Sequence, residues 1–151
     1  MADQEREKTV LLVDDDRPIR EGLRRFFDGT SYRVAGEAAD GMAAVALCRK
    51  LRPDLVLLDV KMPLLNGIDA ARLIREERSA RCIVMLTSFD DQSCVEQALA
   101  AGAAGYLTKP LRAEDILPTL NELVNPYDQP LTEEDLDLPQ AEYYWNGTVI
   151  D

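Results

Sequence analysis

The chain has 151 residues, of which 46% are apolar and 30% are charged, and these values exclude a collagen-like, disulfide-scaffold or wholly disordered chain. The length suits one domain with a short appendage. No stretch approaches the roughly 18 uninterrupted apolar residues of a membrane span. The charged first eight residues do not look like a signal peptide. We therefore expect a soluble, cytoplasmic protein without a membrane segment.

Net charge and missing residue types exclude further functional classes and kinds of site. The net charge of −11 argues against direct binding of nucleic acid, because phosphate backbones bind basic surfaces. The chain has no histidine, which excludes Ser-His triads, histidine general bases and histidine metal ligands. The three cysteines, Cys48, Cys82 and Cys94, lack C-x-x-C spacing and predict neither a disulfide framework nor a zinc site. We expect them to be small buried apolar groups.

Five short apolar segments predict β-strands. They span residues 9–13, 32–36, 54–58, 82–86 and 104–107. The third and fourth are continuously apolar rather than alternating, which is typical of strands buried on both faces of a parallel sheet.

Amphipathic segments between and after these strands predict five helices. They span residues 17–27, 41–50, 67–77, 91–101 and 112–124. Asp16 and Asp40 stand at N-cap positions. Strict alternation of strands and helices with short connections predicts an α/β fold, a doubly wound parallel sheet with helices on both faces. Arg17, Arg20, Arg24 and Arg25 make the first helix basic, and we expect them to form a solvated face.

A change of composition at residue 125 divides a body, residues 1–124, from an acidic tail, residues 125–151. The tail contains seven acidic residues and neither lysine nor arginine. Within it, Asn146-Gly147 lies between aromatic and β-branched residues, which predicts a type I′ hairpin over residues 143–150. A hairpin of two strands needs a surface to pack on, so we expect it to dock on the body or on a second copy. A disordered acidic tail fits the composition equally well.

Polar residues stand where four of the predicted strands end. They are Asp14, Asp15 and Asp16 after the first strand, Asp59 after the third, Thr87 after the fourth and Lys109 after the fifth. In doubly wound sheets the carboxyl ends of strands form the binding site. Clustered carboxylates stay ionised only beside a cation, and their oxygens suit Mg²⁺. With a lysine and a hydroxyl nearby, the set forms a receptor for a phosphoryl group on a carboxylate.

Phosphoryl transfer here would need no histidine in this chain. A carboxylate is already an anion at neutral pH, so Asp59 can act as a nucleophile without a general base. The transferring group needs its negative charge neutralised, which Mg²⁺ and Lys109 would supply. The sequence has neither G-x-x-x-x-G-K-[ST] nor G-x-G-x-x-G. We therefore expect an activated phosphoryl donor rather than ATP.

Four motifs carry a family resemblance. They are LLVDDD at 11–16, LLDVKMP at 57–63, MLTS at 85–88 and GYLTKP at 105–110. In order and spacing they resemble the receiver domain of two-component response regulators, over roughly residues 8–124. The resemblance implies strand order 2-1-3-4-5 and a partner histidine kinase or phosphotransfer protein that phosphorylates Asp59.

The resemblance also implies a role for each remaining site residue. Asp14, Asp15, Asp59 and the backbone carbonyl of Lys61 would bind Mg²⁺. Thr87 and Tyr106 would form the switch pair, and Lys109 would contact the phosphate, before a proline usually preceded by a cis bond. The protein would be a signalling switch that acts on a downstream protein partner, with only self-phosphorylation and slow autodephosphorylation as chemistry. A homodimer formed on phosphorylation is compatible with this family.

Two other functions stay open. The chain could be the receiver fragment of a DNA-binding regulator, but the 27 residues after Val124 are too few and too acidic for a helix-turn-helix domain. We therefore favour a stand-alone receiver. A haloacid-dehalogenase-type phosphatase also has an aspartate nucleophile with Mg²⁺. It needs a second aspartate two residues on, where this chain has Lys61, and the sequence after Asp14-Asp15-Asp16 does not fit that family either.

Overall fold

The computed structural model describes residues 7–62, 64–88 and 92–124. Five parallel strands form one sheet in the order β2-β1-β3-β4-β5, which confirms the predicted topology. The strands are β1 Lys8–Val13, β2 Tyr32–Ala38, β3 Leu55–Asp59, β4 Cys82–Ser88 and β5 Gly105–Lys109. From β1 the chain first adds β2 on one side and then β3, β4 and β5 on the other, so the strand order reverses between β1 and β3. In such sheets the binding site lies at the carboxyl ends of these two strands.

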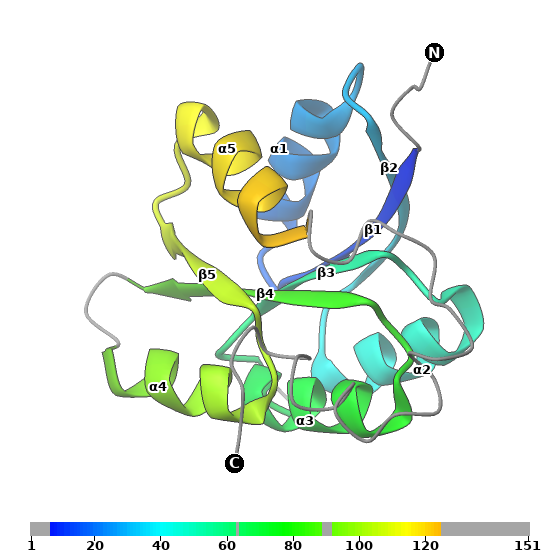
Figure 1. The fold of residues 1–151 in the computed structure, drawn as a ribbon, viewed down its shortest axis with the longest axis vertical. Helices are drawn as coiled ribbons and strands as arrows, with labels where there is room; N and C mark the ends of the chain where they lie inside the picture. Colours follow the sequence, from blue (N-terminus) through cyan, green and yellow to red (C-terminus); the bar gives the residue numbers. More distant parts are fainter. Residues whose placement is uncertain (1–6, 63, 89–91, 125–151) are drawn as a thin grey trace.

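Five helices cover the two faces of the sheet. They are α1 Arg17–Phe27, α2 Gly41–Leu51, α3 Gly67–Glu77, α4 Gln92–Ala101 and α5 Ala113–Val124. Helices α1 and α5 lie on one face, and α2, α3 and α4 lie on the other (Figure 1). The result is the three-layer α/β architecture expected from alternating strands and helices.

Alternation along the strands builds a separate core on each side of the sheet. In β1, Leu11 and Val13 face α2, α3 and α4, whereas Val10 and Leu12 face α1 and α5. All five residues of β3 are buried. A central strand covered on both faces needs apolar residues on both sides, which explains the unbroken apolar run from Leu55 to Leu58.

Several element boundaries differ from the sequence prediction by one or two residues, and the differences in β3 and β2 have a structural cause. Strand β3 begins at Leu55 and not at Asp54, whose carboxylate instead accepts a hydrogen bond from the backbone N–H of Thr9 at 2.8 Å. Strand β2 continues to Ala38 instead of ending at Gly36. Its pairing with β1 contains a register shift, and such bulges leave little trace in a hydrophobic pattern.

The two predicted caps behave differently. The Asp40 side chain accepts a hydrogen bond from the N–H of Ala43 at 2.8 Å, as expected of an N-cap. Asp16 occupies the N-cap position of α1 that the sequence predicts, but its side chain makes no capping bond.

Cys48 and Cys82 are buried, as predicted, and burial is the main cause that raises the pKa of each thiol to about 12. Such thiols are poor nucleophiles at neutral pH. Within residues 7–62, 64–88 and 92–124 no helix is long and apolar enough to cross a membrane. The predicted tail, with its hairpin over residues 143–150, lies outside the described residues.

Candidate functional site

Three carboxylates meet at the carboxyl edge of the sheet. Asp14 and Asp15 follow β1, and Asp59 is the last residue of the neighbouring strand β3. One oxygen of each carboxylate lies within 4.8 Å of the others. Asp14 is 1% exposed and Asp59 7% exposed, whereas Asp15 is exposed. Adjacent parallel strands that end together bring these residues into one cluster, as their sequence positions predict.

Asp14 is held from several sides. Its N–H donates to the carbonyl oxygen of Ala38 in β2 at 3.1 Å. Its Oδ1 accepts a hydrogen bond from the N–H of Asp16 at 2.9 Å. Its Oδ2 is buried and is paired with the Nζ of Lys109 at 2.8 Å, with no other hydrogen-bond donor on it among the described residues. A buried carboxylate oxygen with spare coordination capacity points to a cation ligand.

Lys109 supplies the positive charge at this edge. Its Nζ lies 2.8 Å from Asp14 Oδ2 and 3.4 Å from Asp59 Oδ1. Burial by itself would lower the pKa of Lys109, but its contacts with Asp14 and Asp59 outweigh burial and raise the pKa above its usual value. The ammonium group therefore stays charged. The peptide bond between Lys109 and Pro110 is cis, as the family resemblance implied.

The carboxyl group of Asp59 has a raised pKa. Burial and the charge of Asp14, with a smaller effect from Asp15, raise the pKa of Asp59 to about 6, against the opposing attraction of Lys109. One ammonium group therefore does not fully balance three carboxylates. Asp59 is still mostly ionised at neutral pH, which leaves an anionic oxygen available as a nucleophile.

Gly67, the first residue of α3, fixes the main chain at Asp59. A Cβ atom at position 67 would lie 2.0 Å from the carbonyl oxygen of Asp59, so only glycine allows this approach. The N–H of Gly67 also donates to the carbonyl oxygen of Val60 at 2.8 Å. The start of α3 is thus packed directly against the end of β3.

The remaining predicted site residues lie around this cluster. Thr87 is in β4, directly after Leu86, the residue that pairs with Asp59, and it is only 2% exposed. Tyr106 in β5 is 42% exposed, so its ring is not buried in the core. Lys61 lies two residues beyond Asp59 and is exposed. Asp59, Thr87 and Lys109 lie within their strands and not after them, a small correction to the predicted boundaries.

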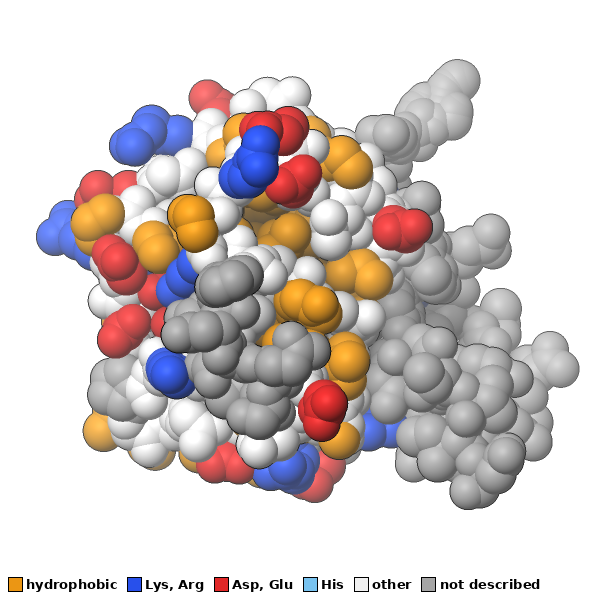
Figure 2. Space-filling view, turned by 90° about the vertical axis from the view of Figure 1, so that its left-hand side faces the viewer, with side chains coloured by type: hydrophobic (Ala, Val, Ile, Leu, Met, Phe, Trp, Pro, Cys, Tyr) orange, Lys and Arg blue, Asp and Glu red, His pale blue; other side chains and the backbone are white. Residues whose placement is uncertain are grey.

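The surface around the carboxyl edge has mixed charge. Figure 2 views the side at which β4 and β5 end, and acidic, basic and apolar side chains alternate there without a broad basic area. This view agrees with the low basic content of the chain.

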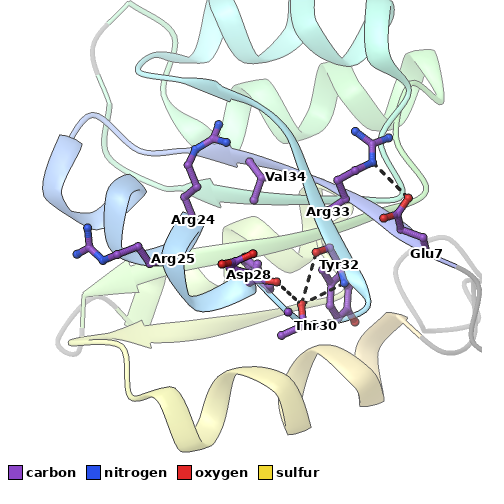
Figure 3. A pocket seen from close by; sticks show the side chains of 10 residues that line it. Glu7, Arg24, Arg25, Asp28, Thr30, Tyr32, Arg33 and Val34 are labelled. Carbon is purple, nitrogen blue, oxygen red and sulfur yellow. Dashed lines mark hydrogen bonds and ion pairs between the residues drawn. The ribbon is translucent and has the colours of Figure 1, made fainter.

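A pocket of about 440 Å³ lies elsewhere, between the end of α1 and the start of β2 (Figure 3). It is at the opposite end of β2 from the carboxylates. The guanidinium groups of Arg25 and Arg33 lie on opposite sides of it and do not converge. Arg33 is already paired with Glu7 at 3.3 Å. We therefore assign the functional site to the carboxylate cluster and not to the pocket.

Sequence reasoning missed two residues next to the site. Arg20 of α1 was expected on a solvated face, but its side chain is only 15% exposed and donates to the carbonyl oxygen of Asp14 at 2.7 Å. Glu37 of β2 accepts hydrogen bonds from both Arg20 and Arg24. The prediction of a solvated face holds for Arg17, which is exposed.

Comparison with known proteins decides the family. The family model described as the response regulator receiver domain matches residues 10–121. The chain belongs to this family. The receiver domain's strand order and acidic edge agree with that assignment, and membership decides against the phosphatase alternative. Receiver domains are signalling switches, which is the class predicted from the motifs.

Three relatives illustrate the relationship. The chain is 42% identical to "Transcriptional regulatory protein PdtaR" from Mycobacterium tuberculosis over 118 residues, covering 78% of this chain and 57% of the relative. It is 35% identical to "Chemotaxis protein CheY" from Halobacterium salinarum, covering 78% of this chain and 97% of the relative. A solved CheX-CheY-BeF3-Mg complex from Borrelia burgdorferi aligns with a TM-score of 0.71 and 28% identity, over 77% of this chain and 88% of that chain.

The receiver domain spans about half the length of several curated relatives that it matches, 57% for the PdtaR protein and 51% for a Bacillus subtilis regulator.

Proposed function

We propose that this receiver domain accepts a phosphoryl group on Asp59 from a phosphohistidine of a partner kinase or phosphotransfer protein. The observation that carries the proposal is the buried Asp59 carboxylate at the end of β3, 3.4 Å from the ammonium group of Lys109 and clustered with two further carboxylates. Such an anion can attack phosphorus without a general base, and the adjacent ammonium group can bind an oxygen of the arriving group.

The transfer exchanges one bond to phosphorus for another. An oxygen of Asp59 forms the new O–P bond while the N–P bond of the phosphohistidine breaks, and its electron pair returns to the imidazole nitrogen. Lys109 attracts the phosphoryl oxygens, and in this proposal the Thr87 hydroxyl donates a hydrogen bond to one of them. The main chain at Gly67 keeps Asp59 at the end of β3, so that the attack is aligned.

Asp14, Asp15 and Asp59 fit a Mg²⁺ ion by their chemistry. They offer hard oxygen ligands, and the buried Oδ2 of Asp14 has only the Lys109 ammonium group as a partner among the described residues. The backbone carbonyl of Lys61 is the further ligand that the family implies. When bound, Mg²⁺ supplies positive charge that offsets the charge of the phosphoryl oxygens. The solved Borrelia complex of the same family contains Mg²⁺, which supports this assignment.

Phosphorylation of Asp59 is proposed to shift a two-state switch. In this proposal Thr87 moves toward the phosphoryl group and Tyr106 turns inward from its exposed position. The change would be read by a protein partner on the surface of α4, β5 and α5. An expected homodimer would use the same surface. Between Arg81 and Lys109 the sequence contains no lysine or arginine, so α4 lacks the basic half of a charge-paired dimer contact.

The output of the whole protein has two candidates. A stand-alone receiver is supported by the 97% coverage of the archaeal CheY protein. The receiver of a longer transcriptional regulator is supported by the 57% coverage of the PdtaR protein. The intact mass of the protein purified from its native cells distinguishes them, because a longer chain would be heavier than 16.9 kDa.

The test of the proposed function is phosphoryl transfer from acetyl phosphate, or from a phosphohistidine donor, to wild type and to Asp59→Asn. Wild type should gain the mass of one phosphoryl group in the presence of Mg²⁺, and the variant, which keeps the fold, should gain none. Full-rate transfer in excess chelator would contradict the Mg²⁺ requirement. Retained phosphorylation of Asp59→Asn would contradict the assigned acceptor.

A further inference from the structure

Arg20 connects the acidic site to the neighbouring strand. Its Nη1 donates to the carbonyl oxygen of Asp14 at 2.7 Å, and its Nε donates to Glu37 Oε1 at 2.9 Å. The Arg20 side chain is 15% exposed, whereas Arg24, which binds the other oxygen of Glu37, is 52% exposed. Ionic hydrogen bonds that are shielded from water are stronger than exposed ones, so the Arg20 contacts are the more consequential pair.

The carbonyl group of Asp14 is the part of this residue that Arg20 holds. The other polar groups are fixed by Ala38, Asp16 and Lys109, as described above. With the hydrogen bond from Arg20, every polar group of Asp14 has a partner just beyond the end of β1. Partners that orient a metal ligand are energetically important, and their loss typically weakens metal binding by about 10- to 100-fold.

A bulge in β2 brings Glu37 to Arg20. Val34 packs in the core under α1 and α5, and simple alternation would place Glu37 on the opposite face. The register instead runs from Val10↔Val34 to Leu11↔Gly36, so Ala35 is an extra residue.

An extra residue exchanges the faces of all residues that follow it. After the bulge, Ala38 packs under α2, α3 and α4, and Glu37 therefore points toward α1. The local geometry of β2 thus places a carboxylate where it holds the Arg20 guanidinium against Asp14.

We propose that Arg20 is a positioning residue for the Mg²⁺ and phosphoryl site, held in place by Glu37 through the bulge at Ala35. The inference rests on the proposed metal site at Asp14. Arg20 fixes the main chain at Asp14 and thereby sets the direction of its carboxylate. Glu37 keeps the guanidinium in place in the absence of Mg²⁺, so that the ligand is oriented before the ion binds.

Arg24 provides a matched control. It also belongs to α1 and binds Glu37 at 2.6 Å, but within the described residues it forms no hydrogen bond or ion pair with Asp14. If the arginines serve only to join α1 to β2, loss of either side chain should have the same effect on Mg²⁺ binding. If Arg20 positions Asp14, only its loss should weaken binding.

The experiment measures the Mg²⁺ dissociation constant by calorimetry for the full chain and for Arg20→Ala, Arg24→Ala and Asp15→Ala. We expect Arg20→Ala to weaken binding about tenfold and Arg24→Ala to leave it within about twofold. Arg20→Lys should recover only part of the loss, because a single ammonium group cannot make both contacts. Amide hydrogen exchange at Asp16, whose N–H binds Asp14 Oδ1, should be faster in metal-free Arg20→Ala than in Arg24→Ala.

Equal dissociation constants and equal Asp16 exchange in the two alanine variants would overturn the role of Arg20. Loss of the proposed metal site looks different, because wild type would then bind no Mg²⁺ or Asp15→Ala would bind it normally. If Arg20→Ala does not fold, Glu37→Gln releases the guanidinium without removing it. That variant should still weaken Mg²⁺ binding several-fold, and unchanged binding would overturn the inference.

Discussion

At Asp59, one buried carboxylate faces two others and a single ammonium group. Burial, and next the charge of Asp14, raises the pKa of Asp59 to about 6, although Lys109 acts in the opposite direction. A site that is two positive charges short is suited to a divalent cation and then to the phosphoryl group that the cation helps to bind. In the proposed function these four side chains, with the Thr87 hydroxyl, carry out phosphoryl acceptance.

Loss of the Lys109 side chain should separate phosphoryl acceptance from signalling. We expect Lys109→Ala to accept phosphate more slowly but to show no gain in partner affinity, because Mg²⁺ still offsets the phosphoryl charge while the link from phosphate to β5 is lost. The measurement is partner binding before and after phosphorylation. Lys50→Ala, which removes an exposed lysine on α2, serves as the control. A wild-type gain in affinity by phosphorylated Lys109→Ala would contradict this role.

The close packing of α3 against the end of β3 requires glycine at position 67. Gly67→Ala would place that atom 2.0 Å from the carbonyl oxygen of Asp59. We expect this overpacking to lower the free energy of unfolding by about 2 kcal/mol and to slow phosphoryl acceptance at the displaced Asp59.

Gly22→Ala is the matched control, because Gly22 lies within α1 with no atom within 4 Å of its Cβ position. Alanine should there stabilise the helix by up to ~1 kcal/mol. Chemical denaturation measures both changes, and a Gly67→Ala protein as stable and as reactive as wild type would show that the junction tolerates a side chain.

Glu37 joins α1 to β2 through a pH-dependent contact. Burial tends to raise the pKa of Glu37, but the hydrogen bonds and charges of Arg24 and Arg20 outweigh it and lower the pKa. A carboxylate with a lowered folded-state pKa stabilises the fold above its unfolded pKa of about 4.3, and this stabilisation disappears as pH falls through the folded value.

We therefore expect Glu37→Gln to lower the free energy of unfolding by about 1 kcal/mol at pH 7 and by much less at about pH 3. Glu21→Gln, which removes an exposed partner of Arg17, should have a smaller effect. Urea denaturation at the two pH values gives the comparison. If Glu37→Gln lowers the free energy of unfolding equally at both pH values, the charge of Glu37 is not the cause.

Elements were predictable to the extent that their signals are local. Unbroken apolar runs identified β3 and β4, and alternation of strands with helices identified a doubly wound parallel sheet, whereas the strand order came from the family resemblance. The extension of β2 to Ala38 was not predictable, because an extra residue at Ala35 breaks the period-2 pattern without a distinctive residue type. Asp16 is at the predicted N-cap position, but the absence of a capping bond from its side chain was not predictable, nor was the hydrogen bond from its N–H to Asp14.

Across the whole molecule, the sheet carries the site at one edge and encloses one core on each face. Asp14, Asp59, Thr87 and Lys109 were predictable as neighbours because parallel strands end at the same edge. Arg20 was not, because its contact with Asp14 depends on the orientation of α1 and on the bulge in β2 together. Its one sequence signal is its position about one helical turn beyond Asp16.

The acidic tail stays a prediction at this scale. If the hairpin over residues 143–150 docks on the body or on a second copy, the sole tryptophan, Trp145, should give blue-shifted emission that is protected from quenchers. Phosphorylation of wild type should alter that emission, and Asp59→Asn should show no such change. A fully solvent-exposed spectrum that phosphorylation leaves unaltered would show that the tail is free.

The most direct test of the account is the chemical location of the phosphoryl group. An acyl phosphate reacts with hydroxylamine to give a hydroxamate, which marks the modified side chain in peptide mass spectra. After phosphorylation with Mg²⁺ present, we expect the hydroxamate at Asp59 alone, and at no residue in the presence of a chelator. A hydroxamate at Asp14 or Asp15, or a phosphoryl group that resists hydroxylamine, would contradict the assignment of Asp59 as the acceptor.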